Sequence, residues 1–287
     1  MLPRRRPLIA THPALEVVSS GYDSPEGPAF DAQGRLHFVN WLSGAVVRVD
    51  PEGRATEVAN TAGVPAGLAF HRDGTLYIAD EGDARPGVLR LPPDGRLHPW
   101  QQAHLGRPLN GANDLVFDAR GGLYFTDSGG SSRQHPVGAV YRAAPDGTLQ
   151  QVDAALAYPN GIALSPDGGT LYVAETETGR LLRYPVHPDG SLGRRETLAT
   201  LAGPPGPDGM ALDEAGRLYV ALWGGGRVAI LEADGRQVAE IPTPGRNPTN
   251  VAFGGPRRET LYITEAETGA VYRTVLGVKG LALFGDG

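Results

Sequence analysis

The chain repeats one pattern of hydrophobic and polar positions six times. Each copy begins with a small or polar residue, reaches an apolar anchor four residues later, passes a glycine-containing turn and continues with Leu-Tyr or an equivalent pair. The first positions of the copies lie 40 to 48 residues apart, at Glu26, Ala66, Asn113, Asn160, Asp208 and Thr249. A period of this length that contains only strand-like units is typical of propeller arrays.

The fourth copy shows how one repeat becomes a blade. Four short apolar segments are separated by Gly- and Pro-containing turns, and they span residues 160–164, 170–175, 181–185 and 196–201. Tight turns of this composition join neighbouring antiparallel strands. Six such copies predict an all-β fold, a six-bladed β-propeller with four antiparallel strands per blade around a central channel.

The last blade lacks a regular fourth strand in the sequence that follows Arg273. We expect the segment at about residues 14–19, which includes Leu15 to Ser19, to supply this strand and to hide both exposed sheet edges. The whole chain, residues 1–287, is then predicted to form a single propeller domain.

The first position of each repeat predicts a metal site. Radial repetition brings equivalent positions to equal distances from one axis, so these side chains form a ring around the channel. Glu26 and Asp208 supply carboxylates, while Asn113 and Asn160 supply amide oxygens. An all-oxygen set favours Ca²⁺, with Zn²⁺, Mn²⁺ or Mg²⁺ as alternative occupants. The competing interpretation is that Asp and Asn at strand starts only satisfy backbone donors in turns.

A second polar column marks the ends of the second strands, and it consists of Asn40, Asp80, Asp127, Glu175 and Glu265, with Leu222 in the fifth copy. Because the second strand runs antiparallel to the first, both columns gather on one face of the disc. We expect Asp127 to lie in the pocket beside Asn113. For Glu175 and Glu265, strand termination at the solvent is the preferred interpretation.

Composition limits the remaining possibilities. The chain has 26 Lys and Arg against 32 Asp and Glu, and the basic residues are scattered, so we expect no nucleic-acid partner. Zero cysteines exclude thiol catalysis and agree with a reducing, cytoplasmic location. The basic start, residues 1–6, precedes a run too short and polar for a secretory signal, and no segment predicts membrane association. We expect a monomer or weak dimer.

Four motifs together resemble the senescence marker protein, gluconolactonase and luciferin-regenerating enzyme family. They are Ser24-Pro25-Glu26-Gly27-Pro28, Asn113-Asp114, the segment from Tyr158 to Asp167, and Pro207-Asp208-Gly209-Met210. The resemblance implies a propeller with a divalent metal in its channel, and metal-dependent hydrolysis of lactones or, in some relatives, of phosphorus esters. It also implies that Glu26, Asn160 and Asp208 are ligands, that Asn113 lies at the metal or on the substrate, and that Asp208 is the acid-base residue.

The chain departs from the animal gluconolactonases of that family at one position. They resemble one another in an Arg two residues before the Asn of the third repeat, where this chain has Gly111, preceded by Asn110. Loss of a guanidinium that could bind sugar hydroxyls argues against aldonolactone specificity. The segment from Phe125 to Gly129 is more similar to the bacterial drug-responsive lactonases of the family. Asn110 and Asn113 are therefore the predicted substrate-binding residues.

Three hypotheses follow for the function. The preferred one is Ca²⁺-dependent hydrolysis of a small lactone or ester, with Asp208 as the general base and Asp127 as the second candidate. The enzymatic alternative is hydrolysis of phosphotriesters or organofluorophosphates at the same site. The alternative without catalysis is a ligand-sensing propeller in which the metal only makes the channel rigid.

Overall fold

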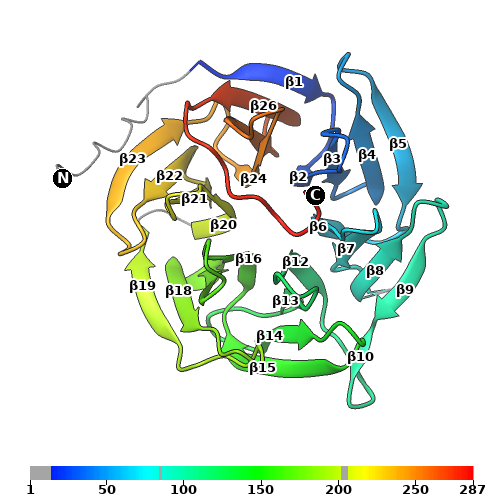
Figure 1. Cartoon of the computed structure of the whole chain (residues 1–287), viewed down its shortest axis with the longest axis vertical. Coiled ribbons are helices and arrows are strands. Elements are labelled where there is room, and N and C mark those ends of the chain that lie inside the picture. The colour runs from blue at the N-terminus through cyan, green and yellow to red at the C-terminus, as the bar shows by residue number, and fades with distance from the viewer. Residues whose placement is uncertain (1–13, 84–85, 202–205, 287) are drawn as a thin grey trace.

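Six four-stranded antiparallel sheets are arranged around one axis in the computed structural model, which describes residues 14–83, 86–201 and 206–286 (Figure 1). The predicted six-bladed β-propeller is confirmed. The basic segment at residues 1–6 lies outside the described residues.

Each blade uses four strands in chain order from the axis to the rim, except the last. The first three blades contain β2 (Pro25–Phe30), β3 (Leu36–Asn40), β4 (Ala45–Val49) and β5 (Ala55–Asn60); β6 (Pro65–Phe70), β7 (Leu76–Asp80), β8 (Gly87–Leu91) and β9 (His98–Gln101); β12 (Ala112–Phe117), β13 (Leu123–Asp127), β14 (Gly138–Ala143) and β15 (Leu149–Leu156). The next two contain β16 (Pro159–Leu164), β17 (Thr170–Glu175), β18 (Arg180–Pro185) and β19 (Glu196–Thr200); β20 (Gly206–Leu212), β21 (Leu218–Trp223), β22 (Arg227–Leu231) and β23 (Gln237–Pro242).

The sixth blade joins the two ends of the described chain. It consists of β24 (Pro248–Gly254), β25 (Thr260–Glu265), β26 (Ala270–Val275) and, at the rim, β1 (Glu16–Ser20). β1 pairs antiparallel with β26, and an ion pair of 3.0 Å between Glu16 and Arg273 lies across the pair. This pairing covers an edge of β26 that would otherwise be open to other chains.

The hydrophobic core lies between the blades rather than inside any one of them. Second strands such as β7 and β13 are buried along their whole length because a neighbouring blade packs on each face. One core cluster joins Val39 of the first blade to Ile78 and Leu89 of the second. Outer strands such as β5 are mostly exposed. Packing between blades therefore holds the inner strands in place around the axis.

Three features fall outside the repeat. A short hairpin, β10 (Ala103–His104) and β11 (Arg107–Pro108), follows β9, and a 3-10 helix, η1 (Thr176–Thr178), follows β17. The segment 276–286 crosses the centre of the ring (Figure 1). It is tied to the fifth blade, where Leu281 N donates to Leu212 O at 2.9 Å, and to the second blade, where Arg72 Nε donates to Phe284 O at 3.2 Å.

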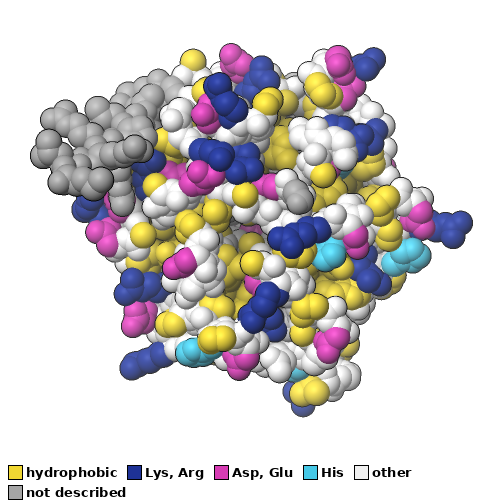
Figure 2. All heavy atoms as spheres, viewed as in Figure 1, with side chains coloured by type: hydrophobic (Ala, Val, Ile, Leu, Met, Phe, Trp, Pro, Cys, Tyr) yellow, Lys and Arg dark blue, Asp and Glu magenta, His cyan; other side chains and the backbone are white. Residues whose placement is uncertain are grey.

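The face crossed by this C-terminal segment carries charges of both signs. Figure 2 shows Lys and Arg interspersed with Asp and Glu around the ring, with hydrophobic side chains between them. Among the described residues, none belongs to a helix with the length and hydropathy needed to cross a membrane.

Candidate metal centre and active site

The six inner strands bring the first positions of the repeats together around the axis. β2, β6, β12, β16, β20 and β24 are innermost and each contacts its neighbours in the ring (Figure 1). The four oxygen-bearing members that were predicted as ligands, Glu26, Asn113, Asn160 and Asp208, are 5 to 7% exposed. Four polar side chains are thus buried in one ring, which is costly unless each finds a partner.

A local irregularity at the start of every inner strand positions these side chains. The pairing register shifts in all six inner strands at or just after the ring residue, for example between Pro159 and Ile162 and between Pro207 and Met210. A β-bulge bends the strand and re-aims a side chain. In four blades a glycine follows the ring residue, because the next blade lies too close for a side chain. A Cβ on Gly161, for example, would lie 2.3 Å from Asp208 O. The bulges and glycines therefore allow Asn160 and Asp208 to approach one another.

The remaining two ring positions supply no free oxygen. Ala66 has an apolar side chain, and the Thr249 hydroxyl donates to Pro25 O at 2.9 Å while bonding to Thr264 Oγ1 at 2.7 Å. Thr249 therefore ties the sixth blade to the first. The oxygen-rich part of the ring is confined to blades one, three, four and five.

The carboxyl groups of the channel raise one another's proton affinity. Burial raises the pKa of Glu26 well above its usual range, and the charges of Asp208 and Asp114 raise it further. Burial and Asp114 likewise raise the pKa of Asp208. For Asp114, burial raises the pKa to about 7. Acids grouped in this way favour the entry of a positive charge that would let them ionise together.

The amide oxygens of the ring fit a hard cation. Asn113 Oδ1 and Asn160 Oδ1 are both buried without a hydrogen-bond partner. Their amide nitrogens face carboxylates, because Asn113 Nδ2 donates to Glu81 and the Asn160 side chain hydrogen bonds to Asp208. Two unpartnered amide oxygens beside two carboxylates match the ligands that Ca²⁺ prefers. No group of three or more His, Cys, Asp and Glu suited to a metal occurs in the described ranges, so the amides are essential to this set.

The second polar column holds loops in place. Asp127 Oδ1 accepts from Gly111 N at 2.7 Å, and Oδ2 accepts from Asn110 N and Nδ2 at 3.1 and 3.2 Å. Asp80 and Glu265 accept backbone N–H groups in the same way, from Val64 and from Asn247. The prediction that Glu175 and Glu265 end their strands at the solvent is wrong, because both are buried and accept backbone N–H groups. The structure places Asp127 against the loop before β12, with Asn110 exposed on that loop.

Comparison with known proteins agrees with the motifs. Residues 24–267 match the family model described as SMP-30/Gluconolactonase/LRE-like region. The chain belongs to this family.

Two curated relatives and one solved structure illustrate the range of this family. Diisopropyl-fluorophosphatase of Loligo vulgaris is 32% identical over 291 residues, which cover 91% of both chains. Lactonase drp35 of Staphylococcus aureus is 34% identical over 249 residues, or 83% of this chain and 75% of the relative. The calcium-binding protein regucalcin of Agrobacterium tumefaciens superposes with a TM-score of 0.80 at 26% identity, covering 95% of this chain and 96% of that one.

Sequence reasoning missed Glu81, a carboxylate beside the ring of this family member. Glu81 directly follows β7, and its carboxylate accepts hydrogen bonds from Trp41 Nε1, Asn113 Nδ2 and Tyr158 OH at 3.3, 3.1 and 3.2 Å. Tyr158 has a φ of 57°, an uncommon conformation for a bulky residue. Its side chain lies near the ring, because Asp208 and Glu26 contribute to the raised pKa of the Tyr158 hydroxyl.

Gly111 occupies a position at which this fold leaves no room for a side chain. It has a φ of 144°, and a Cβ at this position would lie 3.0 Å from Glu81 Cα and 3.1 Å from Glu81 O. The loop that carries Glu81 therefore occupies the place that a side chain at 111 would need.

Asp114 and Asn250 are also absent from the predicted site. They follow the ring positions where four other copies have glycine, which was a signal in the aligned repeats. Asn250 Nδ2 donates to both Glu26 oxygens, at 3.3 and 3.1 Å, and the Asn250 side chain also hydrogen bonds to Asp114. These two residues link opposite sides of the channel next to the ring.

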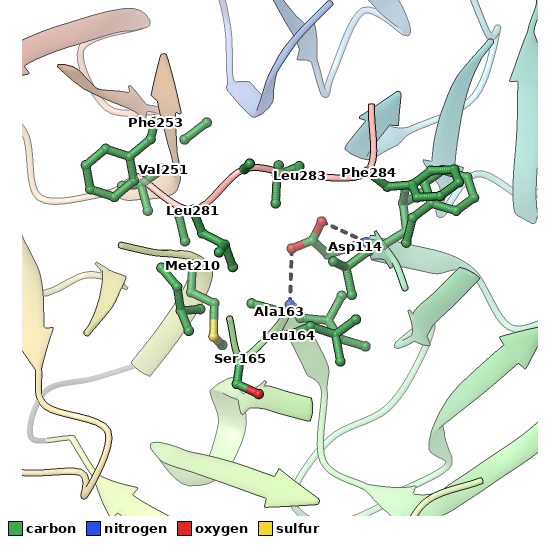
Figure 3. Close-up of a pocket in the computed structure, with 18 of the residues that line it drawn as sticks. Asp114, Ala163, Leu164, Ser165, Met210, Val251, Phe253, Leu281, Leu283 and Phe284 are labelled. Atoms are coloured by element: carbon green, nitrogen blue, oxygen red, sulfur yellow. Dashed lines mark hydrogen bonds between the residues drawn. The ribbon is translucent and has the colours of Figure 1, made fainter. Parts of the chain in front are cut away.

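An apolar cavity occupies the other end of the channel. It measures about 370 Å³ and is lined by inner-strand residues and the C-terminal segment. Figure 3 shows Leu281, Leu283 and Phe284 on one side, Met210 and Leu164 on the other, and Asp114 reaching between them. Both Asp114 oxygens accept backbone N–H groups, from Leu115 at 2.8 Å and from Ile162 at 3.2 Å. Asp114 thus lies between the polar ring and the apolar cavity.

Proposed function

We propose that this protein is a Ca²⁺-dependent lactonase that binds its cation at Glu26, Asn113, Asn160 and Asp208. The observation that carries the proposal is the pair of buried, unpartnered amide oxygens beside two carboxylates whose proton affinity is raised. Membership of a family that includes a staphylococcal lactonase and calcium-binding regucalcin supports both the reaction and the metal. The substrate class is a small lactone or related ester.

Each ring residue has a role in this proposal. When bound, the cation would polarise the lactone carbonyl and stabilise negative charge on its oxygen. Asp208 is the general base that takes a proton from the attacking water, and Asn160 holds its carboxylate in place. Asn113 orients the substrate in addition to its role as a ligand. Asp127 is the less favoured base, because three donors of the loop at 110–111 already occupy its oxygens.

A second candidate function is hydrolysis of phosphotriesters or organofluorophosphates at the same residues. The observation in its favour is the 32% identity with diisopropyl-fluorophosphatase over 91% of both chains. Asp208 would then act on phosphorus, either as a nucleophile or by activating water.

The deciding experiment assays the purified protein with γ- and δ-lactones, including gluconolactone, and with diisopropyl fluorophosphate, before and after treatment with a calcium chelator. We expect lactone turnover that the chelator abolishes and added Ca²⁺ restores. Glu26→Gln should bind Ca²⁺ at least roughly 10-fold more weakly because one ligand charge is lost. Glu52→Gln, on an exposed turn, is the control and should behave like the unmodified protein.

The outcomes separate the candidates. Turnover of the fluorophosphate alone would select the second function. Bound Ca²⁺ without turnover of any compound would favour a ligand-sensing propeller. Lactone turnover that the chelator leaves unchanged would contradict the metal-dependent reaction.

A further inference from the structure

Glu81, one residue past the end of β7, differs from the carboxylates that end β7, β13 and β25 in what it binds. Asp80, Asp127 and Glu265 accept backbone N–H groups and so hold loops. The Glu81 carboxylate instead accepts from three side chains that belong to three other blades, those of Trp41, Asn113 and Tyr158. Its contacts therefore act on side chains at the mouth of the channel.

The bond to Asn113 determines which end of that amide faces the channel. An asparagine amide has a donor end and an acceptor end, whereas an ionised carboxylate can only accept. Glu81 Oε1 lies 3.1 Å from Asn113 Nδ2, so the nitrogen must face Glu81 and the oxygen must point away from it. That oxygen is the buried atom without a partner. A cation can bind the amide oxygen but not the amide nitrogen.

The surroundings hold Glu81 in this position. Gly111, with its φ of 144°, lets the loop before β12 pack closely on the Glu81 backbone. A Cβ at this position would lie only 3.0 Å from Glu81 Cα and 3.1 Å from Glu81 O. Tyr158 keeps a φ of 57° while its hydroxyl reaches Glu81. Uncommon backbone conformations persist only where neighbouring contacts determine them, and they gather at functional sites.

We propose that Glu81 is a positioning residue that fixes the Asn113 amide with its oxygen toward the cation site. This inference rests on the proposed function, because it assumes that Asn113 is a ligand. Partners that orient metal ligands without touching the metal typically change metal affinity or activity by 10- to 100-fold.

The test measures Ca²⁺ affinity by calorimetry, which does not depend on turnover. Glu81→Gln should weaken Ca²⁺ binding by roughly 10- to 100-fold, because a glutamine also offers an NH₂ group and no longer prevents the Asn113 amide from turning over. Asp83→Asn removes one exposed charge from the same loop and is the matched control. Its Ca²⁺ affinity should stay within about threefold of the unmodified protein because water and salt screen that charge.

A double variant supplies an oxygen at position 113 that does not depend on how the side chain is turned. Glu81→Gln combined with Asn113→Asp keeps the net charge, and the new carboxylate presents an oxygen whichever way it turns, while the amide group introduced by Glu81→Gln donates to it. This exchange should recover most of the affinity lost in Glu81→Gln. Thermal melts in the absence of Ca²⁺ check that every variant is folded.

Each result decides between the proposals. If the unmodified protein binds Ca²⁺ and Glu81→Gln binds it as tightly as Asp83→Asn does, Glu81 has no positioning role and the proposed function stands. A double variant that binds Ca²⁺ no better than Glu81→Gln also overturns the role in orientation. If the unmodified protein binds no Ca²⁺, the cation site fails and the role of Glu81 fails with it.

Discussion

The two ends of the central channel are built from the same six strands and differ in nearly every physical property. Where the inner strands begin, amide oxygens of Asn113 and Asn160 lack partners, and burial and mutual repulsion raise the pKa values of Glu26 and Asp208. Where the strands end, apolar side chains and the segment 276–286 enclose a cavity (Figure 3). Burial of these polar and like-charged groups at the first end costs free energy without a ligand. The C-terminal segment of the chain itself covers the second end.

The difference indicates a division of labour along the axis. Unpartnered buried polar atoms and grouped like charges cost stability, and proteins keep them mainly where function requires them. Apolar burial at the opposite end contributes stability and needs no particular chemistry. Substitutions at the polar end should therefore change activity with little loss of stability, and substitutions at the apolar end should do the reverse.

The largest expected effect is on stability and comes from removing residues 281–287. This deletion exposes the ends of the inner strands and removes Leu281 and Phe284, together with the bond from Arg72 to Phe284 O. Burying large apolar side chains contributes about 1.5 to 3 kcal/mol each, so the free energy of unfolding should fall by roughly 4 kcal/mol. Urea unfolding measures the loss, and kcat at saturating Ca²⁺ should be unchanged in the folded fraction.

Two point variants support this test if the truncated protein does not fold. Phe284→Ala should lower the free energy of unfolding by about 2 kcal/mol, since the ring packs on Phe117 and under the Arg72 guanidinium. Leu283→Ala is the control, because Leu283 is 57% exposed and surface changes stay within about 0.5 kcal/mol. A large drop in kcat in either variant would show that the two ends are coupled.

The next effect is on catalysis and concerns Asp208 at the polar end. Asp208→Asn keeps the shape and removes the charge and the basic oxygen, so kcat should fall by roughly 10²-fold or more even at saturating Ca²⁺. The free energy of unfolding of the Ca²⁺-free protein should stay equal or rise, because a buried charge beside Asp114 is removed. Steady-state kinetics and urea unfolding of the same preparation measure both.

Recovery of full kcat at high Ca²⁺ would contradict the role of Asp208 in proton transfer. Asp208 would then be a ligand only, and Asp127 would become the base to test. A loss of several kcal/mol in the free energy of unfolding would instead show that the polar end also stabilises the fold.

Much of the polar end could be predicted because it follows the repeat. The period places Glu26, Asn113, Asn160 and Asp208 in one column, and a propeller turns a column into a ring. The repeat also gave a clue to the role of Asp127. Acids end four of the six second strands, and a position that recurs in this way is expected to be structural. The contacts of Asp127 to Asn110 and Gly111 show the loop-holding role directly.

The residues that the sequence did not predict lie outside the repeated positions. Glu81 is one residue past its strand, so no column contains it, and its contacts join four blades that only the closed ring brings together. The segment 276–286 has no counterpart in other copies, so its place across the channel depends on apolar burial rather than on periodicity. Local pattern therefore predicts the strands, and tertiary packing decides the contacts between them.

The smallest effect is a pH dependence of stability at the apolar end. His37 in β3 is 6% exposed, its Nδ1–H donates to Arg35 O at 3.2 Å, and its ring packs on Phe70, which also contacts Gly285 of the C-terminal segment. Burial lowers the pKa of His37 to about 4, below its ordinary value of 6.5. Between these values the unfolded chain binds the proton and the folded chain does not, so stability falls as the pH falls.

This contribution should be complete above pH of about 6.5 and decline toward pH 4. Between pH 7 and 5.5 it amounts to about 1 kcal/mol of the free energy of unfolding. The carboxyl groups of the ring have raised pKa values and act in the opposite direction, so the measurement must compare two proteins. His37→Gln cannot titrate, and subtracting its unfolding free energies from those of the unmodified protein at each pH removes the shared contribution. A difference that is flat from pH 7 to 5.5 would show that His37 accepts a proton without leaving its place on Phe70.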